Sequence, residues 1–316
     1  MQLRTFALST IACVLLLGSV ARADILDTPI PKPAWTKMIG SLQVQRYGSG
    51  SPALILVPGL SCGAWLFRDT IARESKTHAV YAATLAGFDG VPAGNDDSLD
   101  AVDASLGMLI AGEKLDHPVL IGHSLGGTVV LRYGVEHAAA LAGVVSVDGT
   151  PVFPALASAT PDIRRDAAKQ FYTAVMKAAP AQYATQSTET IDSYITDQTL
   201  AARVAALTLR SDRHAVASYG RDLYASDLRP QLPQLTVRTI LIVPVPAPPI
   251  PAYYPPQMAT MSDDERRTNT VGFYKTLIIG EPSLTIMPVD NSRHFVMFDQ
   301  PLIFAQLLDT FLATLH

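Results

Sequence analysis

The sequence has little cysteine. It contains two cysteines in 316 residues, Cys13 and Cys62. Cys13 falls in an apolar N-terminal stretch that we expect to be removed, so Cys62 would be left without a partner for an internal disulfide. No pair of histidines stands at ligand spacing near Cys62, which excludes the common zinc-site patterns. We therefore expect a fold stabilised by packing, without a zinc site of these kinds.

Charged residues are also scarce. They make up 16% of the chain against 48% hydrophobic residues, and the formal net charge is −4. A chain without a basic excess has no electrostatic means of attracting nucleic acid, so that class of partner is excluded. The composition supports a sizeable core and argues against disorder. The length suits one large α/β domain or two small ones.

Long apolar runs are missing except near the N-terminus. There, Phe6–Val20 is almost entirely apolar or small, follows Arg4, and precedes the small-residue stretch Ala21–Ala23. The run is too short and too near the end to indicate a membrane span. Its basic start and A-x-A ending predict a secretory signal peptide over residues 1–23. We expect a mature chain that begins at Asp24 and is periplasmic or secreted; an uncleaved N-terminal anchor is the alternative.

Beyond that segment, short apolar runs alternate with longer stretches in which apolar residues recur at helical spacing. This is the pattern of an α/β fold with a mostly parallel central sheet flanked by helices. Strands are predicted at Leu42–Tyr47, Ala53–Val57, His78–Thr84, Val119–Gly122, Leu141–Val147, Val237–Val243 and Leu284–Val289. Helices are predicted at Leu99–Ala111, Thr128–His137, Leu302–Leu315, and from the capping box Ser262–Glu265 to near Gly280.

This alternation is interrupted in the middle of the chain. Residues from 155 to about 229 are rich in alanine and polar side chains at helical spacing and contain no convincing strand. We expect a helical cap over residues 152–229, inserted between two parts of one core, 24–151 and 230–316. The proline-rich stretch Pro244–Pro256 can be neither helix nor central strand. It is expected to be an extended loop at a strand end, with a polyproline ligand as the alternative.

A possible nucleophile lies between a predicted strand and a predicted helix. The segment Gly122–Gly126 reads G-H-S-L-G, with Ser124 at its centre. In that context a G-x-S-x-G motif predicts a sharp, strained turn that lifts the serine hydroxyl clear of the sheet. Such a turn needs small residues on both sides of the serine. The N–H groups that open the following helix would then point at the reacting oxygen.

Four segments resemble the α/β-hydrolase superfamily in its serine esterase and lipase branch. They are Ile55–Gly59, Ile121–Gly127, Ser226–Arg229 and Ser292–Phe295. The resemblance extends over nearly all of the chain after the N-terminal segment. It implies a serine nucleophile, a histidine base, a carboxylate and a backbone oxyanion hole, in the chain order nucleophile, acid, histidine.

The resemblance places the base at His294, directly after the last predicted strand. A serine hydroxyl is a poor nucleophile at neutral pH and needs a base to take its proton, a task that suits histidine. His123 is expected to pack elsewhere, because it is the neighbour of the nucleophile in a tight turn. His214 lies in the cap segment and His316 at the terminus, so neither is well placed.

The acid departs from the commonest pattern of the superfamily. That pattern has an aspartate just after the strand predicted at Val237–Val243, but the loop here offers none before Asp263. A minority of members carries the acid one strand earlier, where this chain has Asp148. We expect Asp148 to orient the histidine and stabilise the imidazolium. Asp263 and Asp264 are the alternatives, and Asp290 is too near His294 in sequence to reach its ring.

The oxyanion hole is expected from backbone N–H groups. One belongs to Leu125, which follows the nucleophile, and the other to Leu60, in the loop after the first buried strand. Ser61, Cys62 and Trp65 are expected to line the substrate pocket. Cys62 is not expected to act as a second nucleophile, since no basic residue stands beside it.

These roles describe a serine hydrolase of the carboxylesterase type, EC 3.1.1, that acts through an acyl-enzyme. They call for no metal and no organic cofactor. The expected partner is a small, mostly apolar ester. Two alternatives remain: hydrolysis of an amide, lactone or carbon–carbon bond by the same triad, and a non-catalytic binding protein on a hydrolase scaffold. The cap aromatics either favour an apolar substrate or only pack the cap on the core; they are Phe153, Phe171, Tyr172, Tyr183 and Tyr194.

Overall fold

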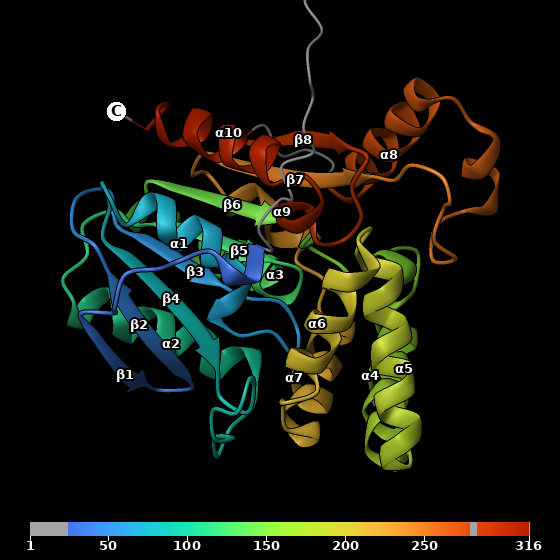
Figure 1. The fold of residues 1–316 in the computed structure, drawn as a ribbon, viewed down its shortest axis with the longest axis horizontal. Helices are drawn as coiled ribbons and strands as arrows, with labels where there is room; N and C mark the ends of the chain where they lie inside the picture. The colour runs from blue at the N-terminus through green and yellow to red at the C-terminus, as the bar shows by residue number, and fades with distance from the viewer. Residues whose placement is uncertain (1–24, 279–282, 316) are drawn as a thin grey trace, which may run out of the picture.

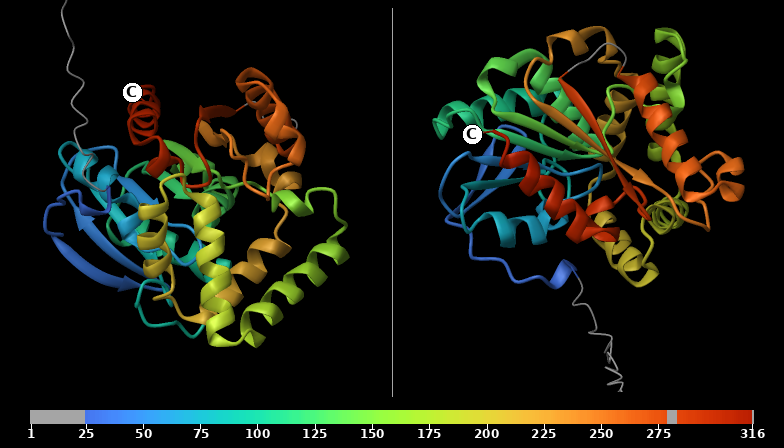
Figure 2. Two further views of the ribbon diagram at one scale, coloured as in Figure 1. Left: turned by 45° about the vertical axis from the view of Figure 1, so that its right-hand side comes forward. Right: turned by 90° about the horizontal axis from the view of Figure 1, so that it is seen from above.

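The computed structural model describes residues 25–278 and 283–315, which form an eight-stranded sheet with helices on both faces (Figures 1 and 2). The strands are β1 (Trp35–Ile39), β2 (Leu42–Tyr47), β3 (Leu54–Val57), β4 (Val80–Leu85), β5 (Val119–His123), β6 (Gly143–Val147), β7 (Thr239–Val245) and β8 (Leu284–Asp290). The α-helices are α1 (Arg68–Glu74), α2 (Leu99–Gly112), α3 (Leu125–His137), α4 (Pro161–Lys177), α5 (Pro180–Tyr194), α6 (Gln198–Thr208), α7 (Arg213–Ala225), α8 (Asp263–Leu277), α9 (Val296–Asp299) and α10 (Pro301–Leu312). Short 3₁₀ helices are η1 (Ile25–Asp27), η2 (Ala64–Phe67), η3 (Ala138–Ala140), η4 (Pro154–Leu156), η5 (Arg229–Gln234) and η6 (Pro256–Thr260).

The spatial order of the strands is β1-β2-β4-β3-β5-β6-β7-β8. Strand β2 runs antiparallel to β1 and β4, and all other neighbours are parallel. The predicted α/β fold with a mostly parallel sheet is therefore confirmed. The predicted strands recur within a few residues, but β1 was not predicted. Its three central residues are exposed, so this edge strand has no apolar alternation to reveal it.

The central strands are buried on both faces, which explains their continuous apolar runs. Successive side chains of a strand point to opposite faces, so Ile55 and Val57 pack in one core and Leu54 and Leu56 in the other. The first core includes residues of α2, α3 and α8, and the second those of α1 and α10. Two layers of helices thus hold the sheet rigid.

Helices α4–α7 lie between β6 and β7 in sequence and extend away from the sheet (Figure 1). We call the segment that contains them, residues 152–229, the cap. Within the cap, α4 packs on α7 and α5 on α6. The chain enters and leaves at one point, which we call the neck. There, Val152 and Asp227 form an antiparallel bridge, and the Leu228 N–H donates to the Pro151 carbonyl at 2.7 Å.

The predicted extended loop at Pro244–Pro256 begins slightly later than expected, because β7 continues through Pro244 to Val245. The last pair between β6 and β7 is Val147–Ile242. Beyond it, β7 pairs with β8 alone, and a strand with one neighbour tolerates proline. No helix or strand then forms until η6.

The capping box predicted at Ser262 is confirmed. The Ser262 hydroxyl accepts from the Glu265 N–H at 3.3 Å, and the Glu265 carboxylate accepts from the Ser262 N–H at 2.8 Å. Helix α8 ends at Leu277; Gly280, near which we predicted its end, lies outside the described residues. The predicted signal peptide over residues 1–23 also lies outside them. In the part that the structure describes, no helix has both the length and the apolar character needed to cross a bilayer.

Candidate active site

The register of the sheet brings the candidate residues to one edge. Strand β5 lies between β3 and β6, and their final pairs join Gly122 to Val57 and His123 to Val147. In parallel strands the carboxyl ends meet at the same edge. Ser124 therefore emerges beside Asp148, with the loop after β3 on its other side.

Ser124 sits in the sharp turn that the motif predicts. Its φ of 53° and ψ of −118° are a conformation that residues with a side chain rarely adopt. A Cβ added at Gly122 would lie 2.1 Å from the Gly126 carbonyl oxygen, and one at Gly126 would lie 2.1 Å from the Val57 oxygen. These contacts are with backbone atoms that cannot move aside. The two glycines are thus required by the turn, which projects Ser124 from the sheet edge.

A second pair of glycines, Gly127 and Gly149, lets the loop that carries Asp148 pack directly against the turn at Ser124. A Cβ added at Gly149 would lie 2.4 Å from the Gly127 Cα, so the start of α3 touches the backbone after β6 directly. Asp148 has a φ of 48°, and its N–H donates to the Ile242 carbonyl at 2.8 Å. Its carboxylate is thereby fixed beside the turn that carries Ser124.

His294 and Asp148 form a hydrogen bond, with 2.5 Å between Nδ1 and Oδ2. Both side chains are mostly buried, at 16% and 12% exposure. Because a carboxylate only accepts, Nδ1 carries the proton, and the neutral ring has its free electron pair on Nε2. This is the tautomer that a general base needs.

Tyr274, on α8, was not singled out by the sequence. Its hydroxyl donates to the second oxygen of Asp148, Oδ1. The side chain is buried, which raises the pKa of Tyr274 well above its usual value and keeps the hydroxyl protonated. Thr270, Tyr274 and Leu277 follow helical spacing and mark the buried face of α8. Nothing in that spacing indicates which buried residue reaches Asp148.

His123 packs inward, as expected for the neighbour of the nucleophile. Its Nε2 donates to the His294 carbonyl at 3.0 Å, and the two rings lie 4.7 Å apart. Burial lowers the pKa of His123 well below its usual value, so the ring is neutral. His123 therefore ties the β5 turn to the loop that bears His294.

The alternative acids lie elsewhere. Asp263 is exposed and pairs with Arg266, and Asp264 is exposed at the same helix start. Asp290 pairs with Arg267 at 2.5 Å. None of these three aspartates lines the cavity onto which His294 opens.

Ser124, Asp148 and His294 line a cavity of about 880 Å³ beneath the cap. Leu60, Ser61 and Cys62 also line it. One expectation is corrected. Trp65 is not in the lining but packs against the core on the α1 face, because its large apolar ring is partly buried there among apolar side chains. Of the cap aromatics, Phe153, Phe171, Tyr183 and Tyr194 line the cavity, whereas the Tyr172 ring packs edge-on against His214.

The two candidate oxyanion donors flank Ser124. Leu125 is the first residue of α3, so its N–H has no acceptor within the helix. Leu60 lies in a tight turn closed by a 3.0 Å hydrogen bond from the Cys62 N–H to the Gly59 carbonyl. A Cβ added at Gly59 would lie 3.2 Å from the Ser124 Cβ, which shows how closely that turn approaches the serine.

The Cys62 thiol does not compete with Ser124 as a nucleophile. Burial raises the pKa of the Cys62 thiol far above its usual value, so the thiol stays protonated and unreactive. Across residues 25–278 and 283–315, no group of three or more His, Cys, Asp or Glu side chains is arranged to hold a metal ion.

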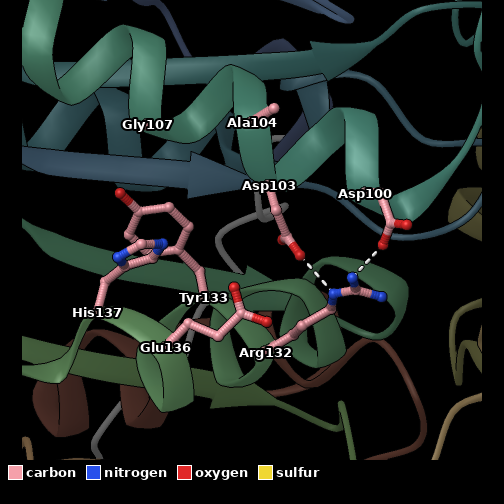
Figure 3. A pocket seen from close by; sticks show the side chains of 8 residues that line it. All are labelled: Asp100, Asp103, Ala104, Gly107, Arg132, Tyr133, Glu136 and His137. Atoms are coloured by element: carbon pink, nitrogen blue, oxygen red, sulfur yellow. Dashed lines mark hydrogen bonds and ion pairs between the residues drawn. The ribbon is translucent and has the colours of Figure 1, made fainter.

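A second pocket, of about 470 Å³, lies between α2 and α3 (Figure 3). There, the Arg132 guanidinium donates to both Asp100 and Asp103. Burial raises the pKa of Asp103 to about 7 even though Arg132 opposes the shift. These charged groups pair with one another, and no serine or cysteine lines this pocket among the described residues. The cavity at Ser124 is thus the better candidate for chemistry.

Comparison with known proteins identifies the family and related folds. Residues 54–307 match the alpha/beta hydrolase family, while no curated protein matches the sequence. The fold resembles an esterase from Thermogutta terrifontis (18% identity, 90% of this chain and 100% of that one, TM-score 0.67). It also resembles the enol-lactonase from Burkholderia xenovorans (14%, 90% and 100%, 0.66) and MenH from S. aureus (15%, 86% and 98%, 0.66). The chain therefore belongs to the alpha/beta hydrolase family.

Proposed function

We propose that the protein is a serine hydrolase that cleaves carboxylic esters of mostly apolar small molecules through an acyl-enzyme. One observation carries the proposal. Ser124, on its strained turn, opens onto the same largely apolar cavity as His294, whose Nδ1 is held by Asp148. A nucleophile, a base and an orienting acid are the minimum that acyl transfer by a serine requires.

In the proposed reaction, Ser124 Oγ attacks the ester carbonyl while His294 Nε2 takes the hydroxyl proton. The negative oxygen of the tetrahedral intermediate accepts hydrogen bonds from the Leu60 and Leu125 N–H groups. As the C–O bond breaks, His294 returns the proton to the departing alcohol. Water, deprotonated by His294, then attacks the acyl carbonyl. The bond between that carbon and Ser124 Oγ breaks, His294 returns the proton to Oγ, and the acid leaves. Asp148 stabilises the imidazolium in both halves.

The bond type is tested with matched leaving groups. We expect release of p-nitrophenol from p-nitrophenyl butyrate and hexanoate, and none of p-nitroaniline from proline p-nitroanilide, in the same buffer. Ester turnover without amide turnover supports the proposal. Amide cleavage without ester cleavage would favour the amidase alternative. If neither p-nitrophenol nor p-nitroaniline is released, but a ligand binds measurably, the binding-protein alternative is favoured.

Tyr274→Phe tests the second hydrogen bond to Asp148. A hydrogen bond to a charged group contributes about 1.5–3 kcal/mol, so we expect kcat to fall by about tenfold or more with KM nearly unchanged. The control is Tyr254→Phe, because Tyr254 lines the same cavity and no hydrogen bond joins it to Asp148. Steady-state kinetics on p-nitrophenyl butyrate separate the two parameters. An equal loss of kcat in both variants would show that Tyr274 does not act by positioning Asp148.

A further inference from the structure

The lining of the cavity at Ser124 carries almost no charge. Among the described residues that line it, Asp148 is the only acidic side chain, and lysine, arginine and glutamate do not occur. The Asp148 carboxylate is already bound by His294 and Tyr274. A ligand that enters the cavity therefore meets no cation and one carboxylate whose two oxygens are occupied.

Two arginines that lie near lining residues in sequence are held by backbone carbonyls. Arg213 donates to the Ala178 carbonyl at 2.8 Å and to two others at the end of α4, and it stacks over Tyr183. Arg293 donates to the Ile195 carbonyl at 3.2 Å and the Pro249 carbonyl at 3.1 Å. Neither lines the cavity, so neither guanidinium is placed to meet an anion there.

Aromatic rings replace charges in this lining. In the cap, the Tyr224 ring stacks on Phe153 at 4.1 Å and on Phe171 at 4.7 Å. Beside the base, Tyr194 lies 4.5 Å from the His294 ring, and burial raises the pKa of Tyr194 to about 12, so its hydroxyl stays neutral. The faces of aromatic rings are electron-rich and disfavour anions.

We infer that the substrate is an uncharged ester with a bulky apolar group, and that the site rejects esters carrying a carboxylate or phosphate. This inference rests on the proposed function and specifies its substrate class. An anion in this cavity would lose its hydration without gaining a cationic partner, which is costly. A flat or branched apolar group would instead pack against the stacked rings of Phe153, Phe171 and Tyr224. The volume of about 880 Å³ is in the range of sites for drug-sized ligands.

The test compares three p-nitrophenyl esters of equal acyl chain length: the hexanoate, the hemiadipate, which ends in a carboxylate, and the methyl ester of the hemiadipate at its far end. Rates without protein are subtracted. We expect kcat/KM for the hemiadipate to be on the order of 100-fold or more below that of the other two. The methyl ester separates charge from size, since it is longer than the hemiadipate but neutral. A hemiadipate rate equal to that of its methyl ester would overturn the inference.

A matched pair of variants tests whether the discrimination against the carboxylate arises inside the cavity. Gln186 and Gln182 are both exposed on α5, but only Gln186 lines the cavity. Gln186→Lys should raise the ratio of kcat/KM for the hemiadipate to kcat/KM for the hexanoate, whereas Gln182→Lys should leave that ratio as it is in the native protein. The same gain from both variants would mean that general surface charge sets the preference, which contradicts the inference. If none of the three esters is hydrolysed, the proposed function itself fails; if the neutral esters are hydrolysed without charge preference, only the inference fails.

Discussion

Replacing Ser124 by alanine is expected to lower kcat for p-nitrophenyl butyrate by on the order of 10⁵-fold or more, close to the rate that binding and oxyanion contacts alone support. The substitution removes one oxygen and keeps the Cβ. The strained backbone conformation at φ 53° is therefore the same in both proteins. The loss should appear in kcat and not in thermal stability.

A fluorophosphonate probe provides an independent measurement. The probe forms a covalent bond to an activated serine, so the native protein should be labelled on the peptide containing Ser124 and the alanine variant should remain unlabelled. Ser187→Ala is the control, since Ser187 lines the same cavity but lies on α5 of the cap. Unchanged turnover in Ser124→Ala would exclude Ser124 as the nucleophile, whatever else the cavity does.

Asp148→Asn is expected to lower kcat by about 10⁴-fold with little change in KM. An asparagine at this position keeps the shape of the side chain but removes its charge. It can also present an N–H to His294 Nδ1, which favours the wrong tautomer of the ring. The base on Nε2 is then lost, and the imidazolium has no counter-charge. Circular dichroism checks that the variant is folded.

Asp263→Asn and Asp264→Asn are the matched controls for this assignment. Both aspartates are exposed at the start of α8, and Asp263 is paired with Arg266. Each variant should keep the kcat of the native protein to within about twofold, because changes at exposed sites away from the chemistry have small effects. A severe loss in either control, with Asp148→Asn active, would transfer the acid role to the start of α8.

The sequence predicted the elements whose burial is continuous or strictly periodic. Strand β2, with its alternation of apolar and polar residues, was predicted with the bounds that the structure has. Strand β1 was missed because its exposed edge position removes the apolar pattern. The G-x-S-x-G turn could be predicted because its glycines are imposed by backbone contacts within a few residues.

The site was less predictable where partners are distant in the chain. The contact between Tyr274 and Asp148 spans 126 residues and depends on how α8 packs against β7 and β8. No local spacing encodes such a contact. Trp65 was placed wrongly for the same reason: its loop position indicated nearness to Leu60, but its side chain packs against buried residues from distant parts of the chain.

The neck formed by Val152 and Asp227 has a consequence for how this protein can diverge. Because the two ends of the cap meet at this bridge, the cap is a closed loop inserted in the core. The entropic cost of closing a loop grows only slowly with its length, so caps of different length can be accommodated at similar cost. Ser124, Asp148 and His294 all lie outside that loop, whereas the stacked ring of Phe171 lies inside it. Changes in the cap can therefore alter which substrates bind while the three catalytic side chains in the core stay the same.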